Sequence, residues 1–167
     1  MAANAGQKVL LVDGDFLCPA LSRHFECSGY ALRDCLQRKR PLFQAIQPNL
    51  DLLGLERADH TLNLQPSQEA RAFFRDCVEH YDLVLIDTPA LSASSAAFPL
   101  ASMADGVILI VSKRAFRDKG IDDLPGMFLL QGTEILGVIV THESALLNGP
   151  PPRSTLDRIL TGLGLKA

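Results

Sequence analysis

Five short apolar segments recur along the chain and alternate with stretches of helical periodicity. The segments are rich in Val, Ile and Leu, are bounded by Asp, Gly or Pro, and comprise residues 9–12, 50–55, 83–86, 107–111 and 136–140. Continuous rather than alternating apolarity is typical of strands covered on both faces, as in a mostly parallel sheet. The pattern therefore predicts a strand at each of these five positions.

Helical periodicity fills the intervals between the strands. The strongest case is 66–80, where Pro66 and Ser67 offer a start, Glu69 supplies an acid to the first turn, and an apolar stripe follows at helical spacing. Further helices are expected at 19–28, 30–38, 93–103 and 154–163. Strands that alternate with helices through right-handed crossovers predict a three-layer α/β fold, with a mostly parallel sheet and helices on both faces.

Composition narrows the class of protein. The chain has 167 residues, 47% of them apolar and 21% charged, which suits a single domain over 1–167 with a sizeable core. The net charge is -3 and the longest basic run is Arg38-Lys39-Arg40, so no electrostatic footprint for nucleic acid is expected. Four cysteines form no CxxC and no metal-binding spacing with the four histidines, which favours a reduced, cytoplasmic setting. No apolar segment approaches the roughly 20 residues that a membrane-spanning helix needs.

Polar residues follow three of the predicted strands at their carboxyl ends, where α/β sheets bind ligands. These residues are Asp13 and Asp15 after the first strand, Asp87, Thr88 and Pro89 after the third, and Thr141, His142 and Glu143 after the fifth. Asp87 has the form of a Walker B aspartate, and with Asp13 and Asp15 it would suffice for Mg²⁺, which prefers one or two carboxylates plus waters and phosphate oxygens. The alternative is that each aspartate merely ends a strand and caps the following turn.

The segments around these strand ends resemble those of bacterial tyrosine kinases. Residues 6–21, GQKVLLVDGDFLCPAL, resemble the family segment GKKVLLIDADLRRPSL, and residues 81–89, YDLVLIDTP, resemble YDYVIIDTPP. Four further matches keep the same order: 30–36 with GLSDVL, 49–54 with NLDVLPAG, 104–111 with ADGVLLVV, and 135–140 with VLGVVLN. Together they cover about residues 6–143 and indicate the branch of P-loop ATPases that contains these kinases, MinD and ParA.

The resemblance implies roles for the strand-end residues. Asp13 and Asp15 stand at the second acidic motif, where the family's carboxylates help to place Mg²⁺ and activate the attacking hydroxyl, and Asp87 stands at Walker B. Thr88 and Pro89 follow Walker B, and Thr141 replaces an asparagine that lies near the nucleotide base. These last three are weaker candidates for cofactor binding.

The chain also departs from the family. The 167 residues contain no GxxxxGK[ST], and hence neither its backbone N–H nest nor its lysine. Phe16, Leu17 and Cys18 replace the arginines that usually follow the acidic motif, and the tyrosine-rich tail is missing. Since one preorganised donor is worth about 2.7 to 4 kcal/mol, we expect that the chain as given neither binds ATP tightly nor transfers phosphate. ATP and Mg²⁺ would be cofactors only if the missing loop were supplied.

Two explanations for the missing P-loop stay open. The chain is either truncated from a longer protein, or it is a naturally degenerate member of the family. In the family a strand, the P-loop and a helix precede residue 6, and that strand lies beside the Walker B strand, so its loss would leave strand edges unpaired. The expected function is that of a kinase-like domain of exopolysaccharide or capsule synthesis and export, impaired in catalysis. Its expected partner is the cytoplasmic segment of a membrane chain-length regulator, which would hold it at the inner membrane, and a homo-oligomer is also considered. The alternatives are a fragment of an active kinase whose P-loop lies upstream of Met1, and a MinD/ParA-like positioning ATPase.

Overall fold

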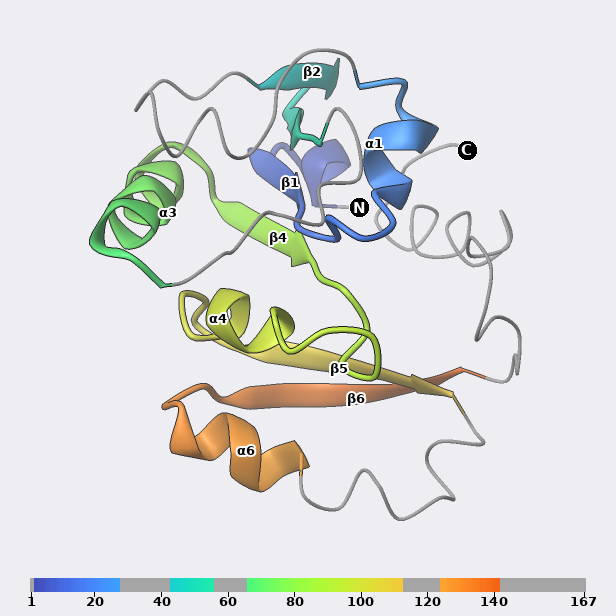
Figure 1. Ribbon diagram of the computed structural model, residues 1–167. Coiled ribbons are helices and arrows are strands. Elements are labelled where there is room, and N and C mark those ends of the chain that lie inside the picture. Colours follow the sequence, from blue (N-terminus) through green and yellow to red (C-terminus); the bar gives the residue numbers. More distant parts are fainter. Residues whose placement is uncertain (1, 28–42, 56–65, 113–123, 142–167) are drawn as a thin grey trace.

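The structure is a computed structural model that describes residues 2–27, 43–55, 66–112 and 124–141, and it has an α/β architecture (Figure 1). The elements follow in the order 3-10 helix Ala3–Ala5, β1 Val9–Asp13, α1 Ala20–His24, β2 Gln44–Gln47, β3 Leu50–Leu53, α3 Gln68–His80, β4 Leu83–Asp87, α4 Ala97–Ala101, β5 Val107–Ser112, α6 Leu124–Leu130 and β6 Ile135–Thr141. All five predicted strands are present. The helices predicted at 30–38 and 154–163 lie outside the described residues.

The strands form two sheets. The first has the order β2-β3-β1-β4, in which β1 runs parallel to both β3 and β4 and only β2 is antiparallel. The second consists of β5 and β6, which run parallel to each other. The predicted mostly parallel sheet is thus confirmed, but across the described ranges no strand pairing joins β4 to β5.

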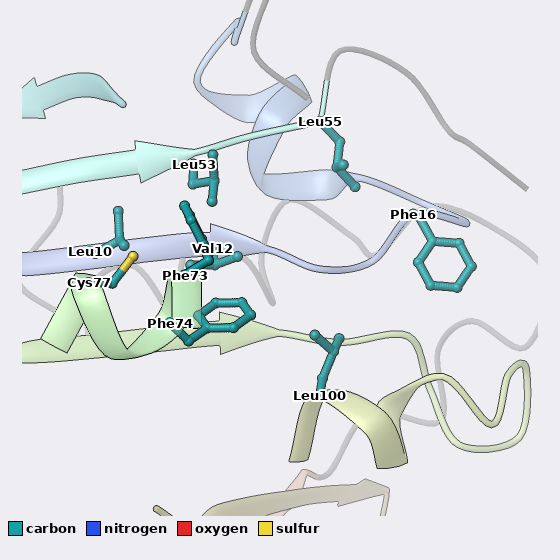
Figure 2. Close-up of a cluster of buried hydrophobic side chains, with 9 residues drawn as sticks. All are labelled: Leu10, Val12, Phe16, Leu53, Leu55, Phe73, Phe74, Cys77 and Leu100. Atoms are coloured by element: carbon teal, nitrogen blue, oxygen red, sulfur yellow. The ribbon is translucent and has the colours of Figure 1, made fainter. Parts of the chain in front are cut away.

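Helices cover both faces of the first sheet, which confirms the predicted three layers. On one face, β1 and β3 pack against α3 and α4 in what we call the α3-side core (Figure 2), made of Leu10, Val12, Phe16, Leu53, Leu55, Phe73, Phe74, Cys77 and Leu100. On the other face, the 3-10 helix and α1 pack against the same strands in the α1-side core, made of Ala3, Val9, Leu11, Leu21, Leu50 and Leu52. Every residue of β1 is buried, as its continuous apolar run predicts.

Among the described residues, the second sheet has a smaller core on one of its faces. It contains Ala101 of α4, Leu109 and Val111 of β5, and Phe128 of α6. Leu100, next to Ala101 on α4, belongs to the α3-side core. The short helix α4 therefore packs against both sheets and holds them together, as its position between β4 and β5 in Figure 1 also shows.

Several predicted boundaries are wrong. The helix predicted at 19–28 is only the five residues of α1, the one at 93–103 is only α4, and the strand predicted at 50–55 ends at Leu53. Two elements were not predicted: β2, which is short and half polar, and α6, whose Pro125 lies in the first turn, where a missing N–H is tolerated. None of the helices in the described part of the chain has both the length and the apolarity to span a membrane.

Candidate functional site

The carboxyl ends of β1 and β4 meet and bring three predicted site residues together. Asp13 pairs in register with Asp87, and one residue further the Gly14 N–H donates to the Asp87 carbonyl over 2.9 Å. A Cβ placed on Gly14 would lie 2.5 Å from that carbonyl oxygen, closer than real Cβ atoms come. The family segment has alanine at this position. In this chain, glycine lets the ends of β1 and β4 come closer together than an alanine side chain would allow. Asp13, Asp15 and Asp87 consequently gather at one end of the sheet.

The side chain of Asp13 is fully buried and is not accessible to a ligand from solvent. Its Oδ2 accepts hydrogen bonds from the backbone N–H of Ser22 over 2.8 Å and from the Ser22 hydroxyl over 2.6 Å, while its Oδ1 accepts from the Asp15 N–H over 3.3 Å. The Ser22 Oγ also accepts from the Leu55 N–H over 2.7 Å. Burial raises the pKa of Asp13, and the hydrogen bonds from Ser22 and Asp15 oppose that rise. The carboxylate thereby ties β1 to α1 and to the segment after β3.

Asp15 organises the loop that follows β1. Its Oδ1 accepts from the N–H groups of Leu17 over 3.1 Å and Cys18 over 3.0 Å, which fixes a tight turn. Phe16 inside this turn is buried in the α3-side core (Figure 2), and Leu17 packs against the same core. The Cys18 sulfur accepts from Arg23 Nη2 over 3.0 Å. Where the family has arginines, this loop therefore presents an apolar surface inward.

Asp87 is the last residue of β4 and is exposed, and Pro89, two residues further on, is buried. Desolvation of its carboxyl by the surrounding chain, and then the negative charges of Asp13 and Asp15, raise the pKa of Asp87 to about 7. A hydrogen bond donated by the Thr88 N–H opposes this rise. Near neutral pH, binding of a cation or a proton at Asp87 therefore stabilises the site.

Thr141 lies apart from this group. It ends β6 in the second sheet, where it pairs with Ser112 and its hydroxyl donates to the Val111 carbonyl over 3.4 Å. Thr88 and Pro89 directly follow β4 and so lie beside Asp87. His142 and Glu143 fall outside the described residues. The structure thus joins the residues predicted at the first and third strand ends, and it places Thr141 on a different sheet.

The side chains present do not by themselves fit a metal ion. In the described ranges, no group of three or more His, Cys, Asp or Glu residues is arranged to hold one. Both oxygens of Asp13 already accept hydrogen bonds from the chain itself. The role of Asp13, Asp15 and Asp87 as Mg²⁺ ligands stays a prediction: Asp13 is buried, Asp15 is half-buried, and Asp87 is exposed.

Two residues of the site were missed from the sequence. Ser22 hydrogen-bonds both to Asp13 and to Leu55, which lies 33 residues further along the chain, and a serine inside a predicted helix gives no signal for that link. Gly14 gave a weak signal, since it replaces the alanine of the family segment between two aspartates. Its importance emerges only from the carbonyl of Asp87 on the neighbouring strand.

Similar proteins are known from sequence. No protein-family model matches the chain. The tyrosine-protein kinase YwqD of Bacillus subtilis is 30% identical over 116 residues, which are 66% of this chain and 49% of YwqD. The putative tyrosine-protein kinase CapB of Staphylococcus aureus is 23% identical over 144 residues, which are 83% of this chain and 63% of CapB. The chain thus spans less than two thirds of either curated relative.

Solved structures agree with these matches. The VpsO kinase domain superimposes with a TM-score of 0.71 at 30% identity, over 83% of this chain and 71% of that domain. The kinase domain of the Escherichia coli tyrosine kinase ETK (TM-score 0.68, 22% identity, 88% and 62% of the two chains) and MinD of Pyrococcus horikoshii with Mg-ADP (0.65, 22%, 93% and 66%) share the fold. With its ordered strand-end motifs and its mostly parallel sheet, the chain shares the fold of MinD and belongs to the family of bacterial tyrosine kinases.

Proposed function

We propose that this chain is a kinase-like domain of exopolysaccharide or capsule synthesis and export that is impaired in ATP binding and acts as a regulatory or interaction module. One observation carries the proposal: the carboxylate of Asp13 is already hydrogen-bonded within the chain itself. Asp13 is 0% exposed and its two oxygens accept three hydrogen bonds, two from Ser22 and one from Asp15. A carboxylate engaged in this way is a poor ligand for Mg²⁺ because binding would break buried hydrogen bonds.

The loop after β1 supports the same proposal. A nucleotide phosphate needs donors or cations, and the turn between Asp15 and Pro19 places Phe16 in the core and directs the Leu17 and Cys18 N–H groups to Asp15. Both backbone donors are therefore used within the turn. The three nearby carboxylates would in addition repel a phosphate unless a cation came with it.

The proposed partner is the cytoplasmic segment of a membrane chain-length regulator. This assignment rests on the family, since YwqD is a tyrosine-protein kinase and CapB a putative one. In this proposal the domain is cytoplasmic and reaches the inner membrane only through that partner. Association can persist after the site loses its chemistry because a docking surface does not require phosphate contacts.

Calorimetry with ATP and Mg²⁺ tests the impaired site. We expect no heat of binding from the chain, while the VpsO kinase domain, titrated in the same buffer, serves as the reference. A dissociation constant tighter than about 10 µM would contradict the proposal. If such binding occurred, the Asp87→Asn variant would tell whether it used this site, with Asp105→Asn, at an exposed residue before β5, as the matched control.

A second candidate is a fragment of an active protein tyrosine kinase whose P-loop lies upstream of Met1. Within the described ranges β4 pairs on one side only, which favours this candidate, because a missing strand would leave such an edge. An in-frame GxxxxGK[ST] in the genomic DNA before Met1 would support the fragment. The third candidate, a MinD/ParA-like positioning ATPase, has less support, since the matches at 30% identity are tyrosine kinases.

A further inference from the structure

We propose that β6, the outer strand of the second sheet, pairs antiparallel with β6 of a second copy of this chain. The two copies would then share one continuous sheet across a two-fold axis. This dimer uses no residue of the acidic site at the ends of β1 and β4, and it requires no nucleotide. It therefore goes beyond the proposed function and does not depend on it.

The outer edge of β6 lacks the features that usually protect an edge strand. Among the described residues β6 pairs with β5 alone, and in Figure 1 it is the outermost strand of its sheet. Six of its seven residues are aliphatic or glycine, the last is threonine, and none is charged or proline. By contrast, β2 at the outer edge of the first sheet contains two glutamines among four residues. An uncharged, apolar edge such as that of β6 readily pairs with another strand.

The apolar side chains of β6 are also poorly covered on the face that carries α4 and α6. On this face Leu109 and Val111 of β5 are buried, whereas Val138 and Val140, which pair with them on β6, are 48% and 40% exposed. The core of the second sheet thus covers β5 better than it covers β6. An additional strand beside β6 would remove apolar surface of both valines from water, which favours association.

The strand β6 is complementary to itself in the antiparallel orientation. Residues that lie opposite each other must point to the same face of the shared sheet, and a two-fold axis at Val138, the middle of the strand, satisfies this condition. Gly137 then lies opposite Ile139 of the second copy. Nothing lies within 4 Å of a Cβ placed on Gly137, and Ile139 is 51% exposed, so the isoleucine of each copy has room beside the glycine of the other. The register irregularity of β6 falls before Gly137, so these central pairs lie in its regular part.

The helix α6 makes a second copy a better occupant than an isolated strand. Because the two-fold axis is perpendicular to the shared sheet, both copies of α6 lie on the same face, one on each side of the axis. Each α6 packs on its own sheet through Phe128 and leaves Leu129 and Leu130 exposed. These leucines are available to cover Val138 and Val140 of the second copy, and a lone strand would leave all four exposed. All opposed positions along β6 are uncharged, so no like charges meet in the dimer.

Analytical ultracentrifugation of the full chain, without nucleotide, tests the association. We expect a concentration-dependent species with twice the 18.1 kDa mass of one chain and a dissociation constant tighter than about 100 µM. Hydrogen exchange of the β6 amides should slow as the dimer forms, and that of the β2 amides should stay the same. Because no ATP is present, failure of this test is independent of the calorimetry that tests the proposed function.

Two charged variants at one position test the two-fold axis. Val138→Lys and Val138→Glu each place like charges opposite each other, and we expect each to weaken self-association by about tenfold or more. A mixture of the two variants places lysine opposite glutamate, and it should form a mixed dimer about tenfold or more tighter than either variant alone.

A matched control uses the same sheet one strand further from the edge. Ile110→Lys introduces the same charge on β5, at a residue that is 57% exposed, and this variant should dimerise as the unchanged chain does. Because Val138 and Ile110 are both exposed by about half, all three variants should fold, which thermal unfolding checks.

Three outcomes would overturn the dimer. The first is a chain that stays monomeric at about 100 µM, whether its β6 amides exchange freely or are already protected by other residues of the same chain. The second is a dimer that Ile110→Lys weakens as strongly as Val138→Lys does, which would indicate that the faces of the sheets pack together and their edges do not pair. The third is a mixture of Val138→Lys and Val138→Glu that associates no better than either variant alone, which would show that Val138 does not lie opposite itself.

Discussion

At the scale of single residues, the hydrogen bonds of Ser22 show how the acidic motif serves the fold. Its hydroxyl donates to Asp13 and accepts from the Leu55 N–H, and the residue is buried. We expect Ser22→Ala to lower the free energy of unfolding by about 1–3 kcal/mol, because a buried carboxylate and a buried N–H each lose a partner. Urea unfolding measures the change. Ser92→Ala, at an exposed residue, is the control, and an equal effect of the two changes would refute this role.

Asp87 gives the site a pH dependence with a definite sign. Its pKa is raised from 3.8 to about 7, so the folded chain holds the proton more tightly than the unfolded chain does. This group therefore lowers stability progressively as the pH rises from about 4 to 7, and the loss is complete above pH 7.

We expect Asp87→Asn to raise the melting temperature at pH 8 and to leave it unchanged at pH 3. The rise should be small, on the order of 2 °C, because the residue is exposed and solvent screens the charge. Thermal unfolding at the two pH values measures it, with Asp105→Asn as the control. A rise of the same size at pH 3 would show that charge is not the cause.

The meeting of Asp13, Asp15 and Asp87 could be predicted from the sequence, since carboxyl ends of adjacent parallel strands share an edge. The burial of Asp13 could not. It depends on Ser22 and on the end of β3, which only the folded chain brings near. The sequence identified the carboxylates that lie together, and the structure shows that Asp13 is the one hydrogen-bonded within the core.

At the scale of elements, α3 is the helix that the sequence predicts best. Ser67 caps it by accepting from the Ala70 N–H over 3.1 Å, and Ala70, Phe73, Phe74 and Cys77 are buried. We expect Ser67→Ala to cost about 0.5–2 kcal/mol of stability, and Ser67→Asp to retain most of it because aspartate also caps helices. Equal losses in urea unfolding for the two variants would argue against capping as the cause.

The close approach of β1 and β4 depends on Gly14. Its replacement by alanine would put a Cβ against the Asp87 carbonyl, so we expect Gly14→Ala to cost about 1–3 kcal/mol and to shift the amide resonances of residues 87 and 88. Gly137→Ala in β6 is the matched control, because nothing lies within 4 Å of its added Cβ. An unaltered stability for Gly14→Ala would mean that the strand ends separate at little cost.

The elements that could not be predicted have a common physical origin. β2 is half polar and pairs only at the edge of the sheet, so its place is set by β3 rather than by its own pattern. The helix α6 contains proline and glycine and buries only Phe128, which packs against Phe98 of α4. Each element is thus placed by a neighbour: β2 by the strand that follows it closely in the chain, and α6 by a helix much earlier in the chain.

At the scale of the whole molecule, α4 packs against both sheets, and no strand pairing joins them in the part of the chain that the structure describes. We therefore expect native-state hydrogen exchange to show that β5 and β6 open at a lower free energy than β1 and β3. Leu100→Ala should destabilise the first sheet by about 2–5 kcal/mol, as a cavity in a packed core does. Uniform exchange energies over all four strands would show that the domain opens as one unit.

The sequence by itself determined the class of fold, the five core strands and the family, because continuous apolar runs and strand-end motifs are local patterns. It also predicted that loss of the strand that the family places beside Walker B would leave strand edges unpaired, and among the described residues β4 pairs with β1 alone. Only the tertiary structure decided that Asp13 accepts hydrogen bonds from Ser22, that Gly14 allows β1 to approach β4 closely, and that α4 packs against both sheets. Each of these depends on groups that lie close in space but far apart along the chain, and no local pattern records such contacts.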